Sequence, residues 1–138
     1  LRKALAPLLA EQPEALHVAV AGATGARQAL AERAAFVAWI NGVPLPNRKK
    51  DSTAKPLKTL ELWGCRAADG FAATRAVAEG NVLCRRLTVL PPNELTPGAY
   101  RKRIAELARA QGWTREEFDF RRLKKMGAGA FCAVAETG

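Results

Sequence analysis

Two adjacent prolines, Pro91 and Pro92, most constrain how this chain can fold. Residues 81–100 read NVLCRRLTVLPPNELTPGAY. Leu90 precedes a proline, which disfavours its α conformation, and neither proline can donate a helical hydrogen bond. A helix that arrives from the N-terminal side must therefore end here. The corner that follows is predicted to separate two parts of the chain.

A second helix is predicted to begin just after this corner. Thr96 can cap it with its hydroxyl, and Pro97 occupies the first helical position, where a missing N–H costs nothing. Apolar residues then recur at helical spacing from Tyr100, and Gly112 stands where a glycine is expected after a helix end. The residues predicted to form the structural junction are Pro91, Pro92, Asn93, Thr96 and Pro97.

Predicted strands and helices alternate along the rest of the chain. Strands are expected at residues 16–20, 57–63, 118–120 and 130–135. Helices are expected at residues 2–10, 26–41, 69–90 (capped by Asp69), 97–111 and 121–126. Such alternation favours an α/β fold, which we expect to be a three-layer mixed sheet with flanking helices.

The charge balance is strongly positive, with 22 lysines and arginines against 13 acidic residues and a formal net charge of +9. Such a balance can serve nucleic-acid binding, which would then depend steeply on salt. The basic residues are dispersed, however, and no stacking aromatics lie between them. Solvated helix faces and loops remain the alternative. The possible basic surface consists of Arg48, Lys49, Lys50, Arg101 and Arg103.

General motifs for chemistry are missing from the sequence. Its three cysteines are widely spaced and form no zinc-type cluster, which predicts buried, reduced thiols in a cytoplasmic protein. The lone His17 lies inside a predicted strand, and the glycines at residues 22–25 fit an ordinary strand-to-helix turn. No apolar run approaches the roughly 20 residues of a membrane span. Composition and spacing alone therefore predict a basic α/β domain of unknown activity without a membrane partner.

Longer segments resemble one known family. Residues 81–87 followed by 91–97 resemble the leucyl (cytosol) aminopeptidase family, in which a long helix leads into a Pro-Pro-Asn-x-x-Thr-Pro segment. Residues 123–135, LKKMGAGAFCAVA, look like the next segment of that family, a helix turn and glycine pair leading into a strand. Residues 38–46, AWINGVPLP, with the basic residues 48–50, look like its bacterial branch.

The resemblance implies a two-domain subunit. Residues 1–92 would be an N-terminal α/β domain, incomplete at its start, with the connecting helix. Residues 93–138 would open a truncated metallopeptidase catalytic domain. In the family that domain holds two divalent metal ions, manganese or zinc, which polarise the scissile carbonyl and activate a water. The metal-binding segments would follow Gly138, so no catalytic or metal-binding residue is assigned here, and no metal is expected on this chain.

Three roles stay open at this point. The first is the N-terminal portion of a two-metal aminopeptidase that removes N-terminal residues from peptides, inactive as this chain alone because peptide substrates would bind the missing catalytic part. The second is a basic domain that binds nucleic acid. The third is assembly of a homo-oligomer, since the family forms hexamers.

Overall fold

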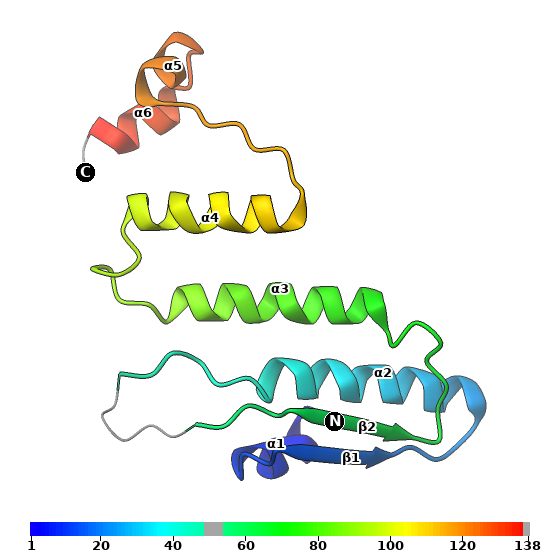
Figure 1. The fold of residues 1–138 in the computed structure, drawn as a ribbon. Helices are drawn as coiled ribbons and strands as arrows, with labels where there is room; N and C mark the ends of the chain where they lie inside the picture. Colours follow the sequence, from blue (N-terminus) through cyan, green and yellow to red (C-terminus); the bar gives the residue numbers. More distant parts are fainter. Residues whose placement is uncertain (49–53, 137–138) are drawn as a thin grey trace. The chain divides into compact units, whose positions relative to one another are not determined.

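The computed structural model describes residues 1–48 and 54–136, which divide into two compact units between Pro92 and Asn93. The first unit contains α1 (Arg2–Ala10), β1 (Ala15–Ala19), α2 (Thr24–Asn41), β2 (Thr59–Trp63) and α3 (Ala72–Thr88) (Figure 1). The second unit contains α4 (Pro97–Gln111), α5 (Phe120–Lys125) and α6 (Gly129–Glu136). The division falls at the double proline. That the units are the two aminopeptidase parts stays a prediction.

The sheet of the first unit has two described strands, which run parallel. Their register pairs Ala15 with Thr59 and continues to Ala19 with Trp63. The chain passes from β1 through α2 to β2, because two parallel strands can be joined only by a long crossover connection. Mixed helices and a parallel sheet agree with the predicted α/β class.

The core of this unit lies on one face of the sheet. One buried cluster joins α1, β1 and α2 through Leu5, Leu9, Leu16, Ala34 and Ala38. A second cluster consists of Val20, Ala31, Ala35 and Phe71. Val18 and Leu60 pack against both clusters, so the two form one continuous core.

The opposite face of the sheet is open in the described residues. Ala15, His17 and Ala19 alternate with the buried positions of β1 and are exposed. On β2, Glu61 lies beside His17, with 2.8 Å between its Oε2 and the His17 Nδ1, and the Trp63 ring is 61% exposed. Apart from Trp63, the exposed side chains named on this face are small or polar and offer little apolar surface to a further layer. The structure therefore does not confirm the predicted three-layer mixed sheet.

The start of α3 differs from the predicted cap. Asp69 does not cap this helix: its Oδ1 accepts a hydrogen bond from the Phe71 N–H at 3.1 Å, which closes a local turn. Phe71 itself is the N-cap, with φ 56° and no side-chain cap bond. Phe71 as a whole is only 8% exposed. We infer that burial of this ring offsets the cost of the left-handed backbone.

The helix after the corner forms as predicted. The Thr96 hydroxyl accepts a hydrogen bond from the Ala99 N–H at 3.2 Å, and Pro97 occupies the first turn. Gly112 ends the helix with φ 67°, in the left-handed region that glycine adopts freely.

The two strands predicted in the second unit are wrong. Asp119 caps α5, its Oδ1 accepting a hydrogen bond from the Arg122 N–H at 2.7 Å, and residues 129–136 form α6. The Asp119 carboxylate accepts from a backbone N–H in the first turn that has no partner within the helix, and the alanines at residues 130, 133 and 135 favour helix. A short strand also needs a neighbouring strand, and the described part of this unit provides none.

Two glycines should respond oppositely to alanine. A Cβ at Gly64 would lie 2.2 Å from the Val20 carbonyl oxygen, and this residue has φ +83°. Gly64→Ala should therefore lower the free energy of unfolding by about 2–3 kcal/mol. A Cβ at Gly80, inside α3, would meet nothing within 4 Å. Gly80→Ala should raise it by about 0.5–1 kcal/mol through helix propensity. Urea unfolding followed by circular dichroism measures both, and equal effects would contradict this account of the β2 end.

The second unit should open more readily than the first. Its only described buried side chains are Ala108 and Cys132, whereas Phe131 and Val134 on α6 are 71% and 75% exposed. Few buried apolar contacts mean a small free energy of local opening. In native-state hydrogen exchange, amides of α5 and α6 should exchange much faster than those of α2. Equal protection in α2 and α6 would contradict this expectation.

Candidate functional site

The predicted junction residues shape the chain but form no reactive group. Helix α3 ends at Thr88, whose hydroxyl donates to the Arg85 carbonyl at 3.0 Å. Pro91 is half-buried, whereas Pro92, Asn93, Thr96 and Pro97 are exposed. Thr96 is committed to capping α4. The role of this segment is to end one helix and begin the next.

The residues of the predicted basic surface are divided between the two units. Arg48 belongs to the first unit, Lys49 and Lys50 lie outside the described residues, and Arg101 and Arg103 are on α4 in the second. Arg101 donates a hydrogen bond to the Glu117 carboxylate, which also pairs with Arg115 at 2.7 Å. Hydrogen bonds from Arg101 and Arg115 lower the pKa of Glu117, so this carboxylate stays charged beside them. Nucleic-acid binding remains a prediction.

Side chains that commonly bind metal ions do not cluster in the part of the chain that the structure describes. No three histidine, cysteine, aspartate or glutamate side chains gather as a possible ligand set in residues 1–48 and 54–136. Cys132 is buried, Cys65 is half-buried and Cys84 is exposed, so the prediction of buried thiols holds only in part. No catalytic step through a metal can therefore be assigned to these residues. Within the same ranges, no helix is long and apolar enough to cross a membrane.

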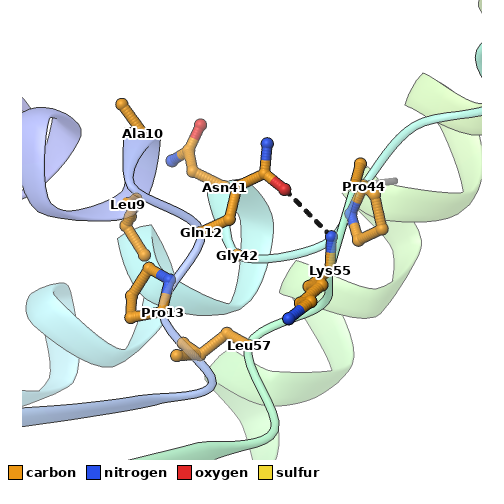
Figure 2. A pocket seen from close by; sticks show the side chains of 10 residues that line it. Leu9, Ala10, Gln12, Pro13, Asn41, Gly42, Pro44, Lys55 and Leu57 are labelled. Atoms are coloured by element: carbon orange, nitrogen blue, oxygen red, sulfur yellow. Dashed lines mark hydrogen bonds between the residues drawn. The ribbon is translucent and has the colours of Figure 1, made fainter. Parts of the chain in front are cut away.

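A small pocket lies where the ends of α1 and α2 meet the segment that leads into β2 (Figure 2). Its volume is about 210 Å³. The Gln12 side-chain oxygen accepts a hydrogen bond from the Lys55 backbone N–H at 3.0 Å, and the Leu57 N–H donates to the Gly42 carbonyl at 2.7 Å. These bonds anchor the loop before β2.

The larger site is a groove beside α3, which we call the α3 groove. It has a volume of about 390 Å³. Side chains from the end of α2, from β2 and its approach, and from α3 line it: Trp39, Val43, Leu57, Lys58, Leu60, Arg75, Ala78, Glu79, Val82, Leu83 and Arg86. Its size lies within the usual range for small-molecule sites.

Polar contacts hold the walls of this groove together. Arg85, on α3, donates from its guanidinium to the Ile40 carbonyl in the last turn of α2, at 2.5 Å. Thr74, near the other end of α3, donates from its hydroxyl to the Glu32 carboxylate of α2. The two helices are thus tied at two places along their length. The groove wall is therefore fixed by contacts that do not use its lining.

Charged groups occur along the groove in different states of pairing. The Arg75 Nε lies 3.4 Å from Glu79 Oε1, and its guanidinium carbon lies 5.7 Å from the centre of the Trp39 ring. Lys58 donates to Glu14 at 3.1 Å, and this contact lowers the pKa of the Glu14 carboxyl. Among the described residues, no acidic side chain pairs with Arg86. One end of the groove therefore carries an uncompensated positive charge.

Sequence reasoning missed this groove, although a signal was present. Arg75, Glu79, Val82, Leu83 and Arg86 follow the spacing i, i+4, i+7, i+8 and i+11, which places them on one face of a helix. That face mixes charged and apolar residues. The contributions of Trp39 and Leu60 depend on the packing of α2 and β2 and carry no such signal.

Proteins of known sequence match parts of this chain. It is 41% identical over 93 residues to the "Probable cytosol aminopeptidase" of Methylorubrum populi. This match covers 64% of this chain and 18% of that protein. A protein of the same name from Prochlorococcus marinus is 32% identical over 92 residues, which are 65% of this chain and 19% of that protein. Another, from Afipia carboxidovorans, is 32% identical over 126 residues, which are 87% of this chain and 23% of that protein. The chain thus spans about a fifth of the length of these curated relatives. No family model and no solved structure matches it. The shared name and identity support the cytosol aminopeptidase family for this chain.

Proposed function

We propose that this chain is part of a two-metal aminopeptidase of the cytosol type, which removes residues from the N-termini of peptides. The observation that carries the proposal is the 41% identity over 93 residues to a probable cytosol aminopeptidase, together with similar matches in other organisms. The proposed parent protein is cytoplasmic and uses two manganese or zinc ions.

Within that enzyme, we assign this chain a structural role. Residues 1–92 would be the N-terminal α/β domain with α3 as the connecting helix, and residues 93–138 would begin the catalytic domain. The division into units at Pro92 supports this assignment. Metal ions would polarise the scissile carbonyl and activate a water when bound elsewhere in the parent.

The parent is further proposed to be a homo-oligomer, a hexamer as in the resembled family. Several large apolar side chains support contact with other protein surfaces. Trp63 is 61% exposed, Trp113 62%, and Phe131 71%. Such exposure costs solvation free energy in an isolated chain, and a covering protein surface removes that cost.

A chimeric enzyme tests the role directly. The 93-residue segment of the Methylorubrum populi protein that matches this chain would be replaced by the matching segment of this chain. If the two segments share a role, the chimera should release leucine from leucyl-p-nitroanilide in the presence of Mn²⁺. Its rate should lie within about tenfold of the parent, since side chains that contact the metals would be unchanged.

The matched control is the same chimera with the order of the inserted residues scrambled, which should neither fold nor cleave. The 138-residue chain alone should show no cleavage with Mn²⁺ or Zn²⁺. Metal-dependent cleavage by this chain alone would contradict the structural role. A well-folded but inactive chimera would contradict the family function.

A further inference from the structure

The α3 groove combines an apolar floor with positive charge. Val43, Leu57, Leu60, Val82 and Leu83 supply aliphatic surface between the two helices and β2. Leu83 is 38% exposed, so part of this surface faces water. An apolar ligand body that displaced this water would gain free energy in proportion to the area covered.

The charges of the lining favour an anion. Lys58, Arg75 and Arg86 oppose one lining carboxylate, Glu79. Arg75 is paired with Glu79 and Lys58 with Glu14, which leaves Arg86 as the cation without an acidic partner among the described residues. A carboxylate at Arg86 would gain a charge-assisted hydrogen bond without breaking an existing pair.

The length of the groove limits the size of the ligand. Arg75 and Arg86 are eleven positions apart on α3, which corresponds to about 16 Å along the helix. The Arg75 guanidinium carbon lies 5.7 Å from the centre of the Trp39 ring. The aliphatic side chains of Val82 and Leu83 lie about one helical turn before Arg86 on α3, which suits an anion with a short alkyl or aryl body.

We propose that the α3 groove binds a small organic carboxylate with an apolar body, the carboxylate at Arg86 and the body over Leu57, Leu60, Val82 and Leu83. This site does not rest on the proposed peptidase function, because it lies wholly in the first unit and uses no metal. It would give the unit a ligand of its own.

Nuclear magnetic resonance of the 138-residue chain tests the proposal at the level of single residues. The isotope-labelled chain would be titrated with 4-phenylbutyrate and, separately, with its neutral analogue 4-phenylbutanamide. The carboxylate should shift the amide signals of Leu57, Leu60, Val82 and Leu83 in a saturable manner. The neutral analogue should bind about tenfold more weakly, because it gains no charge-assisted bond with Arg86.

Three variants separate specific binding from general charge and from loss of folding. Arg86→Gln should weaken 4-phenylbutyrate binding about tenfold. Arg33→Gln removes the same charge from an exposed site on α2 outside the groove and should leave binding unchanged. Leu83→Trp keeps Arg86 but fills the groove and should weaken binding too.

Several results would overturn the proposal. One is the absence of shifts in the groove up to the solubility limit of the ligand. Equal affinity for 4-phenylbutyrate and 4-phenylbutanamide would overturn it as well. So would an equal loss of affinity in Arg86→Gln and Arg33→Gln. Shifts confined to the exposed apolar residues of the second unit would show general hydrophobic binding instead.

Discussion

The close packing of α2 on the sheet is the interaction on which the first unit depends. Ala31, Ala34, Ala35 and Ala38 recur at i, i+3, i+4 and i+7 and are at most 1% exposed. Because alanine side chains are short, the helix backbone can approach the strands closely, and larger residues from α1 and β1 fill the remaining space. A bulkier residue on this stripe would push α2 away from β1 and β2 together. The core is thus built from a row of small residues and a few large ones.

Local signals were the part of the fold that sequence could predict. The cap of α4 by Thr96 and its end at Gly112 depend only on residues within one turn, and both formed as expected. Both strands of the first unit were predicted as well, residues 16–20 from a β-prone apolar run and residues 57–63 from the alternation of apolar and polar residues; their parallel pairing comes from the structure. Residues 130–135 failed because a short run of small apolar residues fits either a strand or a helix, and neighbouring strands decide between them. Asp69 failed for a related reason: its carboxylate can close a turn as well as cap a helix.

The candidate site was less accessible to sequence reasoning than the fold. The predicted basic residues were chosen by charge, and charge alone does not say which unit carries a residue or which acid neutralises it. Arg101 shows the difficulty, since its Glu117 partner lies sixteen positions away and follows the end of α4. The α3 groove needed three elements to come together. Only the residues from α3 recur at helical spacing in the sequence. Their mixture of charged and apolar side chains also occurs on solvent-exposed helices, so the groove is recognised only when Trp39 and Leu60 are placed beside α3.

Helix α3 has two structural roles, because it forms one wall of the groove and also leads to the double proline. Its position is set from α2: Arg85 donates to the Ile40 carbonyl, one of the last-turn carbonyls of α2 that lack a helical partner. A cation at this end also opposes the negative end of the α2 dipole. Arg85 and Arg86 are neighbours in sequence, yet Arg85 holds α3 against α2, whereas Arg86 lines the groove. Their positions 100° apart on the helix allow these two roles, so a ligand bound at Arg86 would leave the Arg85–Ile40 hydrogen bond in place.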